Sequence, residues 1–164
     1  MLDPFHVFEF TDWVNVIALT ADRRVLLVDE YRHGVGEVVR GLPSGVMGKD
    51  ETDPATATAR ELLEGIGHRA EQMWPVAESS ANAASRTNRV WLFLAINCRP
   101  VGDTRFDTGE NIAPVPITLA DSQKDLYAGR PRMQMAHLLG LFAAESFLHG
   151  RHDPSLAEIH LALA

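Results

Sequence analysis

The chain has 164 residues, of which 46% are hydrophobic and 23% are charged. This length and composition fit one globular domain with its own core, and they disfavour an intrinsically disordered chain. Lys and Arg number 15 and Asp and Glu number 22, so the formal net charge is −7. A negative surface disfavours non-specific binding to nucleic acid or to anionic membranes. We therefore predict a single domain over residues 1–164 that binds neither.

Cys98 is the only cysteine, so no internal disulfide can form, as is typical of a reducing compartment. Its apolar sequence neighbours indicate a buried, inert thiol. The first residues lack the basic segment and apolar run of a signal peptide, and no stretch of about 18 apolar residues predicts a membrane span. We expect a cytoplasmic protein.

The first half of the chain is dominated by predicted strands. Two β-branched, apolar runs, Trp13–Thr20 and Arg24–Glu30, flank a turn at Ala21-Asp22 and predict a hairpin. A short extended piece at Glu37–Arg40 leads into Leu42-Pro43-Ser44-Gly45, which has the composition of a turn.

One helix is clear in this half. Asp53 is a good N-cap, Pro54 suits the first helical position, and residues 54–65 are mostly good helix formers. Gly65 and Gly67 follow at the point where glycine commonly ends helices.

Further strands are predicted at Trp74–Ala77, Arg89–Asn97 and Ile112–Ile117, and the second is apolar enough to be buried on both faces. Helices are predicted at Asp121–Ala128 and Arg132–Leu148. This order predicts an α+β fold in which a mixed β-sheet packs between helices, an α/β/α sandwich. The apolar stripe of the last helix is expected to comprise Met133, Ala136, Leu139, Phe142 and Phe147.

The segment from Gly41 to Gly67, GLPSGVMGKDETDPATATARELLEGIG, contains the residues that point to a chemistry. Glu61 and Glu64 are three residues apart on the predicted helix, so their carboxylates are neighbours, and the Gly45 turn comes shortly before them. Mg²⁺ is typically held by one or two carboxylates together with substrate phosphates. The pattern is therefore compatible with a metal–diphosphate site, although a glutamate pair on a helix is more often a solvated face.

The same segment resembles the Nudix box, whose pattern is G-x5-E-x7-R-E-U-x-E-E-x-G-U, where U is a bulky aliphatic residue. The matching residues are Gly45, Arg60, Glu61, Leu62, Glu64 and Gly67.

The residues upstream of the box are similar to the ADP-ribose-pyrophosphatase-like subgroup of this family. Tyr31-Arg32 fits its L-V-x-Q-Y-R segment, and Leu42-Pro43-x-Gly45 fits its E-L-P-A-G segment. The resemblance covers about residues 12–148 and implies the Nudix fold.

The chain also departs from the family pattern. Gly65 replaces the second glutamate of the E-E pair, Gly41 replaces the glutamate of E-L-P-A-G, and Ala113 stands in the closest register where the late-loop general base is expected. One extra residue in the loop before the helix is expected to displace Glu51 from its usual pairing with Arg60. We expect a weakened site for a single metal and a rate reduced by about 10²–10³-fold.

The resemblance implies a hydrolase that uses Mg²⁺ or Mn²⁺ to cleave the diphosphate of ADP-ribose or of a nucleotide sugar. The Gly45 carbonyl, Glu61 and Glu64 are the implied metal ligands, and Arg60 orients the glutamates. Glu61 or Glu110 is the implied base that takes the proton of the attacking water.

Contacts to the nucleotide-type substrate are implied for Arg32, Ser44 and Glu51, although a surface role for Arg32 stays open. The subgroup also implies a homodimer. The acids that could substitute for the missing ligand are Asp50, Glu51, Glu37 and Glu110.

Two functions from different classes stay open. The intact Arg60-Glu61 pair and Glu64 favour a hydrolase. The three replaced acids favour a catalytically inactive Nudix-fold module that binds a nucleotide or a partner, because a fold alone does not decide function. Other chemistries have little support: His149 and His152 lack a third ligand nearby in sequence, and no serine stands in a G-x-S-x-G elbow.

Overall fold

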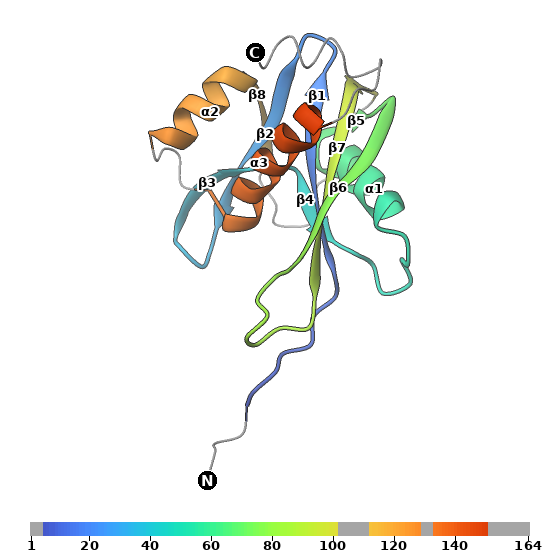
Figure 1. Ribbon diagram of the computed structural model, residues 1–164, viewed down its shortest axis with the longest axis vertical. Helices are drawn as coiled ribbons and strands as arrows, with labels where there is room; N and C mark the ends of the chain where they lie inside the picture. Colours follow the sequence, from blue (N-terminus) through green and yellow to red (C-terminus); the bar gives the residue numbers. More distant parts are fainter. Residues whose placement is uncertain (1–4, 102–111, 129–132, 151–164) are drawn as a thin grey trace.

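The computed structural model describes residues 5–101, 112–128 and 133–150, and Figure 1 shows the arrangement of its elements. Every strand and helix predicted above is present in it, and two short strands, β4 and β5, are additional. Among the described residues, no helix is long and apolar enough to cross a membrane. The elements in chain order are β1 (Trp13–Thr20), β2 (Arg24–Arg32), β3 (Glu37–Gly41), β4 (Ser44–Val46), α1 (Pro54–Ile66), β5 (His68–Arg69), β6 (Gln72–Ser80), β7 (Arg89–Pro100), β8 (Ile112–Thr118), α2 (Leu119–Tyr127) and α3 (Met135–Gly150).

The sheet is mixed and divides along β1 and β2. β1 runs parallel to β7 over its whole length, whereas its other edge pairs with β2 only near its end, at Ala18 and Leu19. The rest of β2 pairs with β3 and β8. The two strands of the hairpin therefore part, and the chain from β3 to β4 crosses the gap between them. We call residues 41–45, which make this crossing, the strap.

The strap corrects the sequence prediction of a simple turn at Leu42–Gly45. Ser44–Val46 form strand β4, which pairs antiparallel with the first residues of β1. Within the strap, the Pro43 carbonyl accepts the Val16 N–H at 3.0 Å. In the described part of the chain, no other strand lies along this edge of the first half of β1. Buried backbone groups need partners, and the strap and β4 supply them.

Helices α1 and α3 cover opposite faces of the sheet (Figure 1). Successive residues of a strand point to opposite faces, and β1 and β2 are apolar at consecutive positions, so each face has its own core. The α3 side buries Ile17, Leu19, Val25 and Leu27 with Leu141, Ala144 and Leu148. The α1 side buries Val16, Ala18, Leu26 and Val28 with Leu62 and Ile66. The α/β/α sandwich predicted from the sequence is confirmed.

Strand β7 is the buried central strand that the sequence predicts. Residues 92–96 are all buried, and it pairs with β1 on one edge and β6 on the other. Cys98 near its end is 3% exposed, and burial raises the pKa of its thiol to about 12. The prediction of an inert thiol therefore agrees with its surroundings, since the thiolate is the reactive form.

The predicted apolar stripe of the last helix is confirmed at Met133 and Phe147, which pack against the core, and is wrong at Leu139 and Phe142. Leu139 and Phe142 are 43% and 48% exposed. The helix is apolar on most sides, so its sequence pattern hardly selects one face. The packing of α3 against the sheet determines which face is buried. Gly140 lies so close to Leu42 that a side chain there would collide with it. The residues that α3 buries are His137, Gly140, Leu141, Ala144 and Leu148.

Both ends of α1 form as the sequence predicts, with Pro54 at the start and Gly67 as the C-cap. The Asp53 carboxylate accepts the Ala55 N–H at 3.2 Å, the Thr56 N–H at 3.1 Å and the Thr56 hydroxyl at 2.6 Å. These bonds satisfy donors that the first helical turn leaves without partners.

Replacement of Asp53 by Ala should lower the free energy of unfolding by about 1 kcal/mol, because the cap bonds to the first turn are lost. Urea unfolding followed by circular dichroism measures the change. Asp53→Asn is the matched control and should retain most of the stability, since its side-chain oxygen still accepts these bonds. Equal stability of the Ala variant and the parent would show that the cap does not stabilise α1.

Candidate functional site

The Arg60 guanidinium holds three carboxylates together. Its Nε and Nη2 each donate to one oxygen of Glu51 at 2.9 Å. Its Nη1 donates to Glu61 at 2.8 Å and to Glu64 at 3.0 Å, and Nη2 also donates to the Val46 carbonyl at 3.2 Å. The planar guanidinium suits such two-pronged pairing. It joins the helix α1 to the preceding loop and to β4.

The predicted displacement of Glu51 from Arg60 is wrong. The extra residue is accommodated by a tight turn, in which the Glu51 N–H donates to the Gly48 carbonyl at 3.0 Å and the Glu51 carboxylate accepts the Gly48 N–H at 2.6 Å. Hydrogen bonds from Arg60 and then from the Gly48 N–H lower the pKa of Glu51 to about 2. The same pairing raises the pKa of Arg60. Glu51 is thus a fixed anion of this cluster.

Glu61 lies directly against the strap. A methyl group added at Gly45 would overlap the Glu61 carboxylate, so only glycine allows this approach of the carboxylate to the backbone of β4. The side chain of Glu61 is 16% exposed and that of Glu64 is 48% exposed. The helix therefore presents one sheltered carboxylate at the strap and one more open carboxylate beside it.

Two carboxylates of α1 form a small donor set of the kind that Mg²⁺ accepts. Glu61 and Glu64 both bind the same Nη1 atom of Arg60, so their carboxylates are close together. Within the described ranges, no group of three or more His, Cys, Asp or Glu side chains is arranged to hold a metal. Two carboxylates suffice for Mg²⁺ only where substrate oxygens and water complete its shell. Nothing lies within 4 Å of a side chain built at Gly65, one turn after Glu61.

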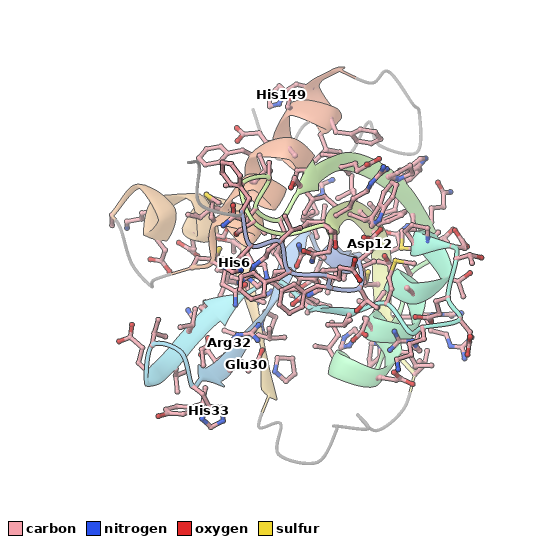
Figure 2. The ribbon with its side chains drawn as sticks, turned by 90° about the horizontal axis from the view of Figure 1, so that it is seen from below. His6, Asp12, Glu30, Arg32, His33 and His149 are labelled. Carbon is pink, nitrogen blue, oxygen red and sulfur yellow. The ribbon has the colours of Figure 1, made fainter. Side chains whose placement is uncertain are left out.

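Two of the residues assigned to substrate contacts, Arg32 and Ser44, and the candidate base Glu110 are not partners of Arg60 among the described contacts. Arg32 forms an ion pair with Glu30 at 2.9 Å, and Figure 2 shows the two side by side on β2. Ser44 lies in β4, opposite Asn15 of β1. Glu110 lies outside the described residues; the described chain resumes at Ile112, which pairs with Glu30.

Among the described residues, the acids that bind Arg60 are Glu51, Glu61 and Glu64, and the other acids and histidines considered from the sequence form no hydrogen bond to it. Glu37, one of the acids that could substitute for the missing ligand, pairs in register with Arg32 at the start of β3. Ala113, which stands where the late-loop base is expected, pairs with Asp29 of β2. His33 stands at the β2–β3 turn, whereas His149 lies near the end of α3 and far from His33 in Figure 2. His152, its predicted companion, lies outside the described residues.

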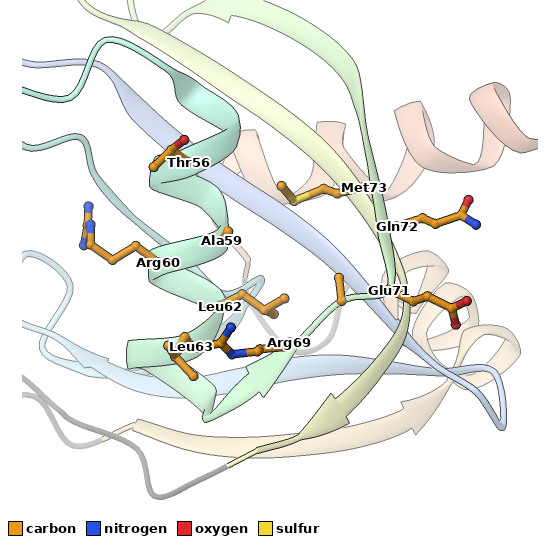
Figure 3. A pocket seen from close by; sticks show the side chains of 10 residues that line it. Thr56, Ala59, Arg60, Leu62, Leu63, Arg69, Glu71, Gln72 and Met73 are labelled. Carbon is orange, nitrogen blue, oxygen red and sulfur yellow. The ribbon is translucent and has the colours of Figure 1, made fainter.

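A cavity of about 470 Å³ lies between α1 and the strands β5 and β6. Figure 3 shows Leu62 and Met73 on this side of the helix, while the Arg60 side chain, which borders the cavity, extends the other way. The cavity wall is largely apolar and includes Thr56, Ala59, Leu63 and Ala70. It is therefore separated by α1 from the carboxylate cluster.

Sequence reasoning missed the part that His137 plays in this region. The His137 side chain is 1% exposed, and its Nδ1 accepts the Leu42 N–H at 3.3 Å. Its ring fills the space next to Gly41: a side-chain carbon built there would lie 2.7 Å from the ring Cε1. The two partners are 95 residues apart, and no local pattern in the sequence connects them.

The NUDIX domain family model matches residues 10–135, well over half of the chain. The chain belongs to the Nudix domain family. The resemblance inferred from the box at Gly45–Gly67 is thus confirmed, although Gly65 replaces one glutamate of the box.

Two curated relatives are similar to this Nudix domain. The methanol dehydrogenase activator of Bacillus methanolicus is 37% identical over 60 residues, which are 37% of this chain and 32% of that protein. The ADP-ribose pyrophosphatase of Bacillus subtilis (strain 168) is 25% identical over 112 residues, 68% of this chain and 60% of that protein. In both cases the match spans less than two thirds of the relative's length.

A crystal structure described as an ADP compounds hydrolase has a similar fold, with a TM-score of 0.75 and 21% sequence identity. The alignment covers 86% of this chain and 74% of that chain. At this level of identity the likeness establishes the fold, and the α+β class predicted from the sequence is confirmed.

The buried His137 should make the stability of this Nudix domain depend on pH. Burial, and then the nearby charge of Arg32, lower its pKa from 6.5 to about 4. Between these two values the unfolded chain binds more protons than the folded one, so the free energy of unfolding falls as pH falls from 6.5 to 4. The expected loss is up to about 3 kcal/mol. Urea unfolding at a series of pH values measures it.

His137→Gln, which does not titrate, is the control and should flatten the curve in this range. A wild-type stability that stays constant between pH 6.5 and 4.5 would contradict the assignment of a neutral, buried imidazole.

Proposed function

We propose that this Nudix domain is a pyrophosphohydrolase that cleaves the diphosphate of a nucleoside diphosphate linked to another moiety, such as ADP-ribose or a nucleotide sugar. The observation that carries the proposal is the cluster in which Arg60 holds Glu51, Glu61 and Glu64 while Glu61 packs on Gly45. The ADP-ribose pyrophosphatase among the similar proteins supports the substrate class.

A divalent cation, Mg²⁺ or Mn²⁺, fits this proposal. Glu61, Glu64 and the Gly45 carbonyl are the groups that would hold it, with substrate phosphate oxygens completing the shell. When bound, such an ion neutralises diphosphate charge and makes water easier to deprotonate. Arg60 keeps Glu61 and Glu64 in place by donating to one oxygen of each. We expect the binding to be weak, because Gly65 offers no third carboxylate on this face of α1.

The reaction is a hydrolysis in which a water oxygen forms a bond to one phosphorus. The bond from that phosphorus to the bridging oxygen breaks, and the bridging oxygen leaves on the second phosphate. A carboxylate, Glu61 or Glu110, takes the proton of the water. Arg32, Ser44 and Glu51 are proposed to line the substrate path, and a homodimer is proposed from the resemblance to the subgroup.

A second candidate is a Nudix-fold module that binds a nucleotide or a partner without cleaving it. The observation that favours it is the sparse donor set: within residues 5–101, 112–128 and 133–150, no group of three or more possible ligand side chains is arranged for a metal. Binding of the nucleotide without turnover is its distinguishing result.

Incubation with ADP-ribose and a panel of nucleotide sugars, with Mg²⁺ or Mn²⁺, should release AMP or the matching nucleoside monophosphate. Glu61→Gln should slow this release by about 10²–10³-fold, because a charge at the reacting groups is removed while the shape of the side chain is kept. Glu71→Gln is the matched control, since Glu71 is exposed and lies across α1 from the cluster. Chromatography of the products measures both rates.

Equal rates for Glu61→Gln and the control would remove Glu61 from the mechanism. If the wild type binds a nucleotide sugar but releases no monophosphate from any member of the panel, the hydrolase proposal fails and the binding module stands.

Gly65→Glu should raise the affinity for Mn²⁺ by about tenfold, which corresponds to about 1.4 kcal/mol. Position 65 lies one helical turn after Glu61 and has open space for a side chain. Ala59→Glu adds the same charge on the cavity side of α1 and is the matched control. Titration of Mn²⁺ by electron paramagnetic resonance measures the affinity. An unchanged affinity in Gly65→Glu would show that this face of α1 does not bind the metal.

A further inference from the structure

The strap is contacted by a titratable side chain from each of the two helices that sandwich the sheet. Glu61 of α1 lies against Gly45 at one end, and His137 of α3 lies against Gly41 at the other. At both ends an added methyl group would collide with the facing side chain. The path of the strap is therefore fixed by two close approaches, and a shift at one end changes the fit at the other.

His137 does more at the strap than fill space. Its Nδ1 accepts the Leu42 N–H, so the neutral ring carries its own hydrogen on Nε2. Nε2 is buried and has no hydrogen-bond partner among the described residues, which costs stability. A leucine would fill a similar volume without this cost, but it could not accept the Leu42 N–H.

A second buried polar group adjoins the strap. Asn15 of β1 is fully buried, its amide oxygen and nitrogen lack partners within the described part of the chain, and it stands opposite Ser44 in the pairing of β1 with β4. Unpartnered buried polar atoms are rare in folded proteins and call for an explanation. Successive residues of a strand alternate between faces, so Asn15 points to the α3 side together with Ile17, the side from which His137 reaches Leu42.

We propose that His137 is a positioning residue for the carboxylate site: by holding the Leu42 amide and the Gly41 backbone, it sets the strap at the place where Gly45 receives Glu61. His137 does not touch the reacting groups and acts through the strap. The consequence for turnover rests on the proposed hydrolase function, whereas the consequence for the geometry of Glu61 does not.

The experiment compares three variants of the full chain. His137→Leu removes the acceptor and keeps the bulk, and His137→Gln offers an oxygen that can accept the Leu42 N–H. Leu148→Ala weakens the same helix and core eleven residues further along α3, about 16 Å away by helix rise. It controls for a loss of stability alone.

Two nuclear magnetic resonance measurements need neither metal nor substrate. The first is hydrogen exchange of the Leu42 amide relative to the Leu94 amide of β7, which should rise about tenfold in His137→Leu and return to within about threefold in His137→Gln. The second is the resonance of the Glu61 carboxyl carbon, which should shift in His137→Leu only. Leu148→Ala should change neither.

Turnover of ADP-ribose provides the third measurement, in which His137→Leu should lower kcat about tenfold and His137→Gln should restore it. If the wild type shows no turnover, the proposed function fails while the two resonance measurements still decide the role of His137. The proposal is overturned if the Glu61 resonance is unchanged in His137→Leu, or if it shifts equally in Leu148→Ala.

A further variant covers the case in which His137→Leu does not fold. Gly41→Ala leaves His137 in the chain but forces its ring away from the strap, so the Glu61 resonance should shift in the same way. The double change Gly41→Ala with His137→Ala removes the collision and should fold better than Gly41→Ala alone. An unchanged Glu61 resonance in Gly41→Ala would equally overturn the proposal.

Discussion

The crossing of five residues between two diverging strands is the constraint on which the rest of the structure depends. β1 and β2 part after a short paired stretch, and the strap closes the gap by giving its backbone groups to β1. Both faces of the strap are then occupied, by α1 on one side and α3 on the other. The position of the carboxylates follows, because Glu61 has only the space that Gly45 leaves.

On the α1 side of the strap, ion pairs with Arg60 hold the carboxylates in place. Three carboxylates crowded together would repel one another, and the Arg60 guanidinium relieves this by donating hydrogen bonds to all of them. Glu51 takes two of these bonds and is the most firmly bound partner, which leaves one oxygen of Glu61 and one of Glu64 outside the contact with Arg60. The arrangement separates Glu51, which Arg60 holds by two bonds, from Glu61 and Glu64, the two acids proposed to bind the metal.

Much of this architecture could be predicted from sequence because it depends on local patterns. The β1–β2 hairpin, the caps of α1 and the buried strand β7 follow from periodicity and from residue types at helix ends. The neighbouring carboxylates of Glu61 and Glu64 follow from their spacing. The Glu51–Arg60 pair was mispredicted because counting residues in the loop cannot show that the turn at Gly48 absorbs one.

The contacts that could not be predicted are long-range. The buried face of α3 depends on how closely Gly140 approaches Leu42, and the contact between His137 and the strap joins residues 95 apart. Such contacts also limit how the sequence can change. A larger residue at position 41 is compatible with this fold only if position 137 becomes smaller, so attempts to graft an acid into the strap need a compensating change in α3. The absence of an acid at Gly41 is, in this sense, a property of helix α3 and the strap together and not of one motif.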